Sequence, residues 1–224
     1  MKNKYKLFFK TILDIGLNRL IGRIKYEIRK KFDKIMPEFL VLYFADANNE
    51  TPIFKKELKN LILESNNYLL NKKIKNKFVF KFLNQEEYLT LPIDWNNSNF
   101  TQLWRFNLHY FDWAREFLDY RINNGTWSKD SSLLKILIDD WINNNKLGKG
   151  DGWHSYTISL RIRNWIWLFR IFPTFATKKR INSLWDQICW LEKHPEKCHG
   201  GNHWLENLIS LAIGSLQFNG KKSS

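Results

Sequence analysis

The stretch KKRINSLWDQICWLEK, residues 178–193, carries the pattern that decides the fold. Apolar residues recur in it three or four positions apart, which places them along one side of an α-helix. This apolar stripe consists of Ile181, Leu184, Trp185, Ile188 and Leu191. The pattern predicts a helix that buries one face against its neighbours.

Similar helical periodicity flanks this stretch. It predicts further helices at residues 101–122, 131–145, 155–171 and 203–218. The links between the helices are short and contain Gly or Pro, for example Gly148, Gly152 and Pro173. Helices joined by short links pack as antiparallel pairs. The periodicity and the short links therefore predict a mostly α fold for the second half of the chain, built as an array of helical hairpins.

The first half of the chain is less regular. Residues 5–34 have the pattern of a basic amphipathic helix, with Lys and Arg outside the apolar positions. Such a helix either packs on the rest of the fold or lies on an anionic membrane surface. We expect packing, because most amphipathic helices in soluble proteins are half-buried. Residues 39–44 and 78–91 favour short irregular or β-like segments, and residues 54–70 favour another helix.

The composition combines positive charge with many aromatic residues. The 224 residues carry a formal net charge of +14, and 16% of them are aromatic, including 11 Trp. A positive field attracts nucleic acid, acidic polysaccharide and anionic lipid alike. A Lys-rich coding bias accounts for the charge equally well. Trp and Tyr suit stacking on sugar rings as well as core packing, so composition alone does not choose a partner.

Several classes of protein are disfavoured by the sequence. Only two cysteines occur, so there is no disulfide framework and a reducing compartment is permitted. No stretch reaches the roughly 20 apolar residues of a membrane span. The amino-terminal segment has no clean apolar core of a signal peptide, because Asp14, Arg19 and Arg23 interrupt it. We expect a cytoplasmic or membrane-peripheral protein.

Three segments in the second half carry a resemblance to a known family. The first is DW at 94–95 followed by LWRFNLHYF at 103–111. The second is WHSY at 153–156 followed by SLRIRNW at 159–165, and the third is GGNHWLEN at 200–207. In this order they resemble the amino-terminal domain of heparinase II/III-type polysaccharide lyases, over about residues 78 to 220.

The resemblance implies an incomplete α/α toroid, usually followed by a β-sandwich, that catalyses β-elimination on uronate polysaccharides such as heparan sulfate or alginate without a cofactor. It divides the chain into a basic helical region, 1–77, and an incomplete toroid portion, 78–224. The family's proton-donating Tyr lies after the Asn-His segment, and no Tyr follows His203. We therefore expect a fragment that is inactive alone, or one that needs a second chain to supply the rest of the toroid.

By the resemblance, Asn202 and His203 are the candidate catalytic residues. Gly200 and Gly201 permit close approach of a ligand, and a helix start favours an anion. The Asn202 amide can bind the uronate carboxylate, and the His203 imidazole can abstract the proton at C5. The alternative interpretation is structural, because Asn is also a preferred helix N-cap.

The candidate substrate-binding residues are aromatic and amide side chains of the first two segments: Trp104, Asn107, Tyr110, Trp153 and Tyr156. The first three lie at positions i, i+3 and i+6, so we expect them to share a broad helix face. That face is either a wall for sugar stacking or a set of buried aromatics. For Arg161 in the second segment, we expect a role in tying helices together.

A zinc site competes for the same region. Cys189, His194, Cys198, His199 and His203 are potential ligands within a short stretch. Their spacing is not that of a zinc finger, so we expect no metal. Two alternative functions also stay open. One is a non-catalytic protein that binds acidic polysaccharide or serves in assembly, and the other is a basic protein that binds nucleic acid or a membrane surface.

Overall fold

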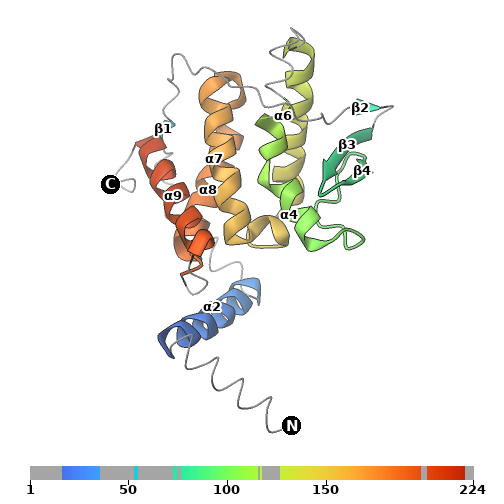
Figure 1. The fold of residues 1–224 in the computed structure, drawn as a ribbon. Coiled ribbons are helices and arrows are strands. Elements are labelled where there is room, and N and C mark those ends of the chain that lie inside the picture. The colour runs from blue at the N-terminus through green and yellow to red at the C-terminus, as the bar shows by residue number, and fades with distance from the viewer. Residues whose placement is uncertain are drawn as a thin grey trace.

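The structure is a computed structural model that describes residues 17–35, 53–54, 73–74, 77–115, 117, 127–197 and 201–219. These residues are mostly helical, as predicted (Figure 1). The helices are α2 (Leu17–Ile35), α4 (Gln102–Tyr110), α6 (Trp127–Asn144), α7 (Ser155–Ile171), α8 (Lys178–Lys193) and α9 (Gly201–Gln217), with short 3-10 turns η1 (Asp151–Trp153) and η2 (Pro173–Phe175). The predicted helices after residue 127 are thus confirmed, with small shifts of their ends.

In the part of the chain that the structure describes, the helices are accompanied by five short strands: β1 (Ile53–Phe54), β2 (Lys73–Ile74), β3 (Lys77–Phe82), β4 (Gln85–Leu89) and β5 (Phe218–Asn219). β2, β3 and β4 form an antiparallel sheet, so the β-like prediction for residues 78–91 is confirmed as a hairpin. β1 pairs with β5, which places Phe54 in a strand and not in the predicted helix. Residues 5–16, 39–44 and 55–70 lie outside the described part of the chain.

The predicted helix 101–122 does not run through as one element. α4 ends at Tyr110, and Phe111 adopts a left-handed backbone with φ of 63°. The side chain of Phe111 is fully buried, between Trp95 and Trp165. Burial of this ring accounts for a conformation that a non-Gly residue seldom adopts. Residues 112–115 are helical again, beyond the break.

α7 is the central helix of the bundle. It packs against α4, α8 and α9 (Figure 1). The start of α7, the end of α8 and the start of α9 meet at one carboxylate, Glu196, through His154 and His203. α8 therefore runs antiparallel to both α7 and α9, which agrees with the predicted hairpin arrangement.

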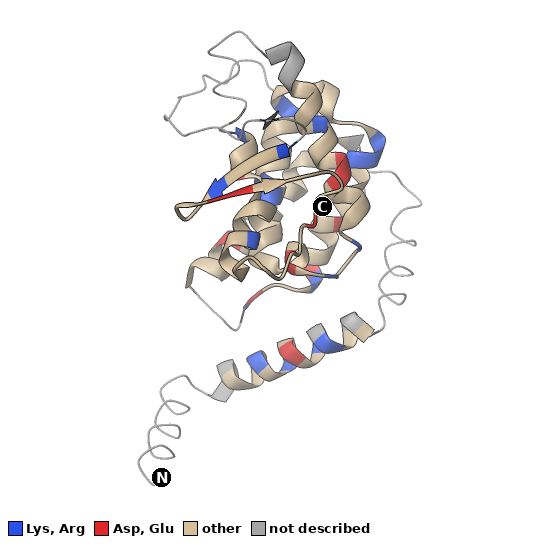
Figure 2. Ribbon diagram, turned by 90° about the vertical axis from the view of Figure 1, so that its right-hand side faces the viewer, with Lys and Arg blue, Asp and Glu red and all other residues tan. Residues whose placement is uncertain are grey.

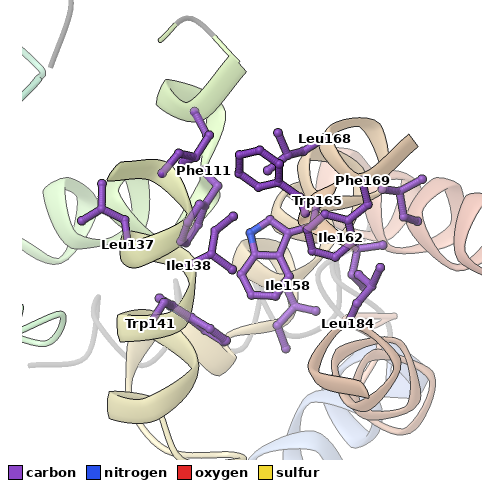
Figure 3. Packing of buried hydrophobic residues seen from close by; sticks show 14 of the residues in the cluster. Phe111, Leu137, Ile138, Trp141, Ile158, Ile162, Trp165, Leu168, Phe169 and Leu184 are labelled. Carbon is purple, nitrogen blue, oxygen red and sulfur yellow. The ribbon is translucent and has the colours of Figure 1, made fainter. Parts of the chain in front are cut away.

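Most of the aromatic excess is used in the core. Among the residues whose burial is described, eight Trp side chains are buried. Trp141 and Trp165 meet edge to face with ring centroids 5.5 Å apart (Figure 3). Each such pair stabilises the fold by about 0.5–1.5 kcal/mol beyond the contribution of the apolar area that it buries. The abundance of Trp therefore reports on packing more than on sugar binding.

Arg161 ties the bundle together, as predicted. Its guanidinium is fully buried and donates to the side-chain oxygen of Gln187 at 2.8 Å and to the carbonyl oxygens of His109 at 3.1 Å and Gly152 at 2.7 Å. It also lies 3.9 Å from the ring centroid of Trp141. Burial lowers the pKa of Arg161 well below its usual value. One side chain on α7 thus joins α4, η1, α6 and α8.

α2 departs from the packing expectation. Five of its apolar side chains are exposed, namely Ile21, Ile24, Ile28, Phe32 and Ile35, whereas Leu20, Gly22 and Tyr26 are half-buried. Gly22 and Tyr26 lie on the side of the helix opposite the exposed stripe. The expectation of a helix packed by its apolar face is therefore wrong for residues 17–35. None of the described helices combines the length and apolar character needed to cross a membrane.

We predict that Arg161→Ala lowers the free energy of unfolding by about 3 kcal/mol or more. The substitution leaves the two buried carbonyl groups without donors, at a cost of about 1–3 kcal/mol each, and opens a cavity. Urea unfolding measures the change. Lys146→Ala, at an exposed position, is the control and should change stability by less than about 0.5 kcal/mol. A loss below about 1 kcal/mol for Arg161→Ala would contradict the assigned role.

A second prediction concerns Asp186 on α8. Burial raises the pKa of its carboxyl group from 3.8 to about 6. The folded state therefore binds more protons than the unfolded state between these values, and stability falls as pH rises through this window. Asp186→Asn removes the cost of burying an ionised carboxylate. The substitution should therefore stabilise the protein by about 2 kcal/mol at pH ~7.5 and by nearly nothing below pH ~4. Unfolding curves at both pH values test this. A pH-independent difference would refute it, and Asp94→Asn, an exposed control, should show no effect.

Candidate functional site

α9 begins at an open position on the surface. Gly201 has φ of 56°, and a Cβ built on it would meet no other atom within 4 Å. Asn202, the second residue of this 17-residue helix, is exposed. Within the described part of the chain, its side chain makes no hydrogen bond. The structure therefore gives no support to the capping interpretation of Asn202, and the amide lies beside the positive end of the helix dipole.

His203 is held on two sides. Its Nδ1 lies 3.1 Å from Oε2 of Glu196, and its ring stacks on Tyr156 with centroids 4.3 Å apart. The imidazole is nevertheless 45% exposed. When Nδ1 carries the proton of the neutral ring, Glu196 accepts it and Nε2 becomes the basic nitrogen. The arrangement orients an accessible imidazole much as a carboxylate orients a catalytic base.

Glu196 is the central acid of the site. Its carboxylate is almost fully buried, and its other oxygen, Oε1, lies 3.5 Å from Nε2 of His154. The Phe106 ring packs on His154, with centroids 5.1 Å apart. A buried carboxylate needs partners, and two imidazoles supply them here. We call the set Asn202, His203, Glu196, Tyr156 and Tyr110 the α9 entrance.

Two tyrosines extend the α9 entrance toward α4. The rings of Tyr110 and Tyr156 meet edge to face with centroids 6.0 Å apart. Burial raises the pKa of Tyr110 above its usual value, and the neighbouring phenol of Tyr156 adds to the shift. Burial, and then the charge of Glu206, raise the pKa of Tyr156. Both phenols therefore keep their protons at neutral pH and are able to donate a hydrogen bond to a ligand.

A hydrogen-bonded chain fixes α9 on α7 beneath the site. Asn207 accepts from the backbone N–H of Glu196 at 2.7 Å and donates to Oγ of Ser159 at 2.9 Å. Ser210 donates to the carbonyl oxygen of Ser159 at 2.8 Å. All of these polar side chains are fully buried, so each bond replaces one to water. The third sequence segment is thus locked to the second.

Charged groups of both signs surround the phenols. Nη1 of Arg163 lies 2.9 Å from Oε2 of Glu206. Asp112 accepts from Asn164 at 2.6 Å, and burial raises the pKa of Asp112. The acids near His203 are therefore partnered. The exposed groups that could meet an anion include the Asn202 amide, the first turn of α9 and Lys197, whose ammonium group lies 5.6 Å from the ring centroid of Trp204.

A polar pocket adjoins the α9 entrance through His154. Its cavity volume is about 170 Å³, which is smaller than the ~300–1,000 Å³ of typical ligand sites. The pocket is lined by Tyr26, Gln102, Gly148, Gly150, Asp151, Trp153, His154, Ser155, Trp190 and His194. Gly150 has φ of 77°, and a side chain there would overlap Asn96, so this wall requires glycine.

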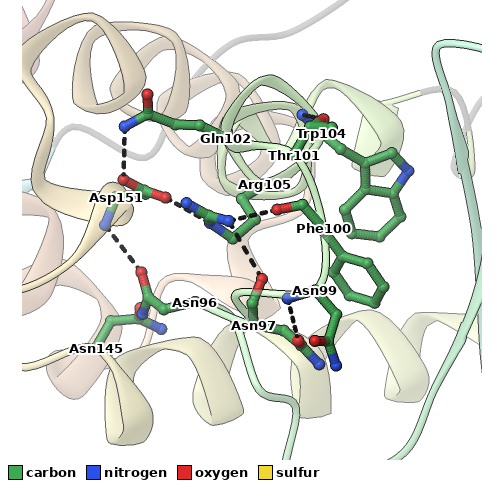
Figure 4. Close-up of polar contacts among 10 residues, drawn as sticks. All are labelled: Asn96, Asn97, Asn99, Phe100, Thr101, Gln102, Trp104, Arg105, Asn145 and Asp151. Carbon is green, nitrogen blue, oxygen red and sulfur yellow. Dashed lines mark hydrogen bonds and ion pairs between the residues drawn. The ribbon is translucent and has the colours of Figure 1, made fainter.

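The wall of the polar pocket is a hydrogen-bonded junction of the first two sequence segments (Figure 4). Asp151 accepts from Nε of Arg105 at 2.6 Å and from Nε2 of Gln102 at 3.2 Å. The backbone N–H of Asp151 donates to Asn96 at 2.8 Å. Arg105 also donates to the carbonyl oxygen of Phe100. These contacts hold η1, and with it Trp153, against the start of α4.

The predicted site residues fall into three groups. The rings of His203, Tyr156 and Tyr110 come together at the α9 entrance, and Asn202 precedes His203 in the first turn of α9. Trp153 lines the polar pocket, but it is largely buried between Trp141 and Trp190. Trp104 and Asn107 of α4 lie elsewhere.

Trp104 and Asn107 do not join the site. Trp104 has no exposed surface, donates to the carbonyl oxygen of Gln85 at 3.3 Å and packs on Phe82. Asn107 donates to the carbonyl oxygen of Leu103 in its own helix, at 2.8 Å. Positions i and i+6 are about 240° apart around a helix, so Trp104 faces the β3–β4 hairpin while Tyr110 faces Tyr156. The prediction of a shared face is therefore wrong, and no sugar can stack on Trp104.

Sequence reasoning missed Glu196. No motif contains it, and its place between two histidines arises from the meeting of α7, α8 and α9. The available signal was weak: a carboxylate seven residues before His203 in a stretch rich in His. Among the described residues, no group of three or more His, Cys, Asp or Glu is arranged to hold a metal ion. Cys198 and His199 of the zinc alternative lie outside these residues.

Comparison with known proteins gives no match: no family model, curated protein or solved structure resembles the chain closely enough to be related to it. The family resemblance therefore rests on the three sequence segments. What the structure adds is that these segments meet at one end of the bundle, through Arg105–Asp151 and Asn207–Ser159.

Two asparagines of α9 give a matched test of this geometry. We predict that Asn207→Ala lowers the free energy of unfolding by about 2–3 kcal/mol, because the Glu196 N–H and the Ser159 hydroxyl lose buried partners. Asn202→Ala should change stability by less than about 0.5 kcal/mol, because the side chain is exposed. Urea unfolding of both variants measures the difference. A comparable loss for Asn202→Ala would restore the capping interpretation.

Proposed function

We propose that the chain binds uronate-containing polysaccharide at the α9 entrance, and that this site serves the β-elimination chemistry of heparinase II/III-type lyases. One observation carries the proposal. The exposed Asn202, in the first turn of a 17-residue helix, is followed directly by His203, whose accessible imidazole a buried carboxylate orients. A carboxylate receptor beside a positioned base is what proton abstraction next to a carboxylate requires.

In this proposal, Asn202 and the first turn of α9 bind the uronate carboxylate. Negative charge on that group grows as the C5 proton leaves, so a hydrogen bond from the amide strengthens toward the transition state. The helix dipole acts in the same sense, by about 0.3–1 kcal/mol at an exposed site. Tyr156, whose phenol keeps its proton, lies beside the same space through its stack on His203.

His203 is the proposed base. Nε2 takes the proton from C5, and the electron pair of the C5–H bond passes into the enolate of the carboxylate. The enolate then expels the glycosidic oxygen at C4, which forms the C4=C5 double bond, and the leaving oxygen takes a proton from a phenol or from water. Glu196 stabilises the imidazolium formed in the first step, since its oxygen accepts from Nδ1.

The same proposal includes the finer architecture. α4 and α6 to α9 would form part of an incomplete α/α toroid, for which the antiparallel run of α7, α8 and α9 is the support. Leu205, Leu208 and Leu216 on α9 are exposed apolar residues. They offer a surface that a second chain supplying the rest of such a toroid would cover.

We predict that Asn202→Ala weakens binding of alginate or heparan sulfate oligosaccharides about tenfold or more. A hydrogen bond to a charged group contributes about 1.5–3 kcal/mol, and 1.4 kcal/mol corresponds to a factor of ten. Isothermal titration calorimetry measures the affinity. Asn182→Ala, at a half-buried position on α8, is the control and should bind like the wild type.

Three outcomes separate the parts of the proposal. Equal affinity for neutral dextran, or no loss with Asn202→Ala, overturns uronate recognition at this site. Binding accompanied by the ultraviolet absorbance of unsaturated uronates, lost in His203→Gln, supports the elimination step. Binding without such product leaves recognition in place and assigns the chain to non-catalytic polysaccharide binding.

A further inference from the structure

The apolar side chains of α2 form one exposed stripe. Ile24, Ile28 and Ile35 are 51%, 62% and 77% exposed, and Ile21 and Phe32 are about half exposed. Their spacing of three, four or seven residues places all five within a narrow arc of the helix. Leaving so many large apolar side chains in water is unfavourable by about 25 cal/mol per Å² of exposed apolar surface.

Within the described part of the chain, no helix or strand covers this stripe. The opposite side of α2 contains Gly22 and Tyr26, which are less exposed, and Tyr26 lines the polar pocket with Asp151 and His154. α2 lies beside one end of the bundle (Figures 1 and 2). Because Tyr26 lines the pocket, α2 turns the side with Tyr26 toward the bundle and its exposed apolar stripe away from it. A helix that serves only to complete a core has the reverse orientation.

Positive charge flanks the stripe. Residues 17–35 contain seven Lys and Arg and two Asp and Glu, a formal charge of +5. Arg23, Lys25, Arg29 and Lys31 are all exposed and border the apolar arc on its two sides. Figure 2 shows basic residues along much of the helix. An aliphatic stripe between basic flanks is the pattern of a helix that lies in a membrane interface.

We propose that α2 is an interfacial helix that binds anionic lipid bilayers, with the isoleucine stripe among the acyl chains and the Lys and Arg side chains on the phosphates. Charge and apolar surface together select this partner. A second copy would bring two helices of charge +5 together, and nucleic acid would leave the stripe in water. An anionic bilayer satisfies both features at once.

The binding geometry follows from the two sides of the helix. With the stripe in the lipid, Tyr26 and the polar pocket lie on the far side of α2, about one helix diameter, ~10 Å, from the surface. The bundle then stands on the membrane by the end at which α7 and α9 begin (Figure 1). This inference is independent of the proposed polysaccharide site.

Sedimentation with vesicles tests the proposal. The full chain is mixed with sucrose-loaded vesicles of phosphatidylcholine alone or with phosphatidylglycerol, at low and moderate salt. We expect binding to the anionic vesicles, and a decrease of about tenfold or more in the partition coefficient for Ile24→Gln/Ile28→Gln. Ile136→Gln is the matched control, because Ile136 on α6 is also an exposed isoleucine, at 45%.

Each other outcome overturns the proposal. Absence of binding to the anionic vesicles does so directly, provided that circular dichroism shows a folded chain. Equal binding by the double Gln variant means that the stripe does not insert. If analytical ultracentrifugation shows that the wild type is a dimer and the double Gln variant is a monomer, the stripe binds a second copy of the chain. If the chain instead binds RNA at least as tightly as vesicles, with an affinity that depends on salt and is the same in the double Gln variant, α2 binds nucleic acid.

Discussion

The buried guanidinium of Arg161 is the constraint on which the arrangement of this protein depends. A planar group with five donors can satisfy acceptors in several directions at once, and here they come from α4, α8 and η1. The ring of Trp141 covers one face of it. Gly152 lies just before Trp153 and the start of α7. The hydrogen bond from Arg161 to the carbonyl oxygen of Gly152 therefore also fixes where α7 begins. The candidate site is built at that point.

From there, hydrogen bonds lead to the surface in short steps. Ser155 and Ser159 on α7 connect to Asn207 on α9, and Asn207 holds the backbone of Glu196. The Glu196 carboxylate then orients His203. Buried, hydrogen-bonded residues thus hold the helix that carries the exposed imidazole and the exposed amide. Binding and catalytic residues need to be held in place in this way.

Part of this organisation could be predicted from the sequence. The helices after residue 127 followed from apolar periodicity, and Arg161 was expected to join helices. The break at Phe111 could not be foreseen, because neither Gly nor Pro marks it and a buried ring between Trp95 and Trp165 imposes it. Glu196 and the outward stripe of α2 were missed for the same reason, since both depend on contacts between distant segments.

Asn202 and His203 were selected by resemblance, and their exposure beside a helix start makes the selection physically testable. The most direct measurement is a nuclear magnetic resonance titration of the labelled chain with a uronate oligosaccharide. Our account predicts that the side-chain amide of Asn202, the imidazole of His203 and the first backbone amides of α9 shift together at one affinity. Shifts confined to other surfaces, with these signals unmoved at saturation, would contradict it.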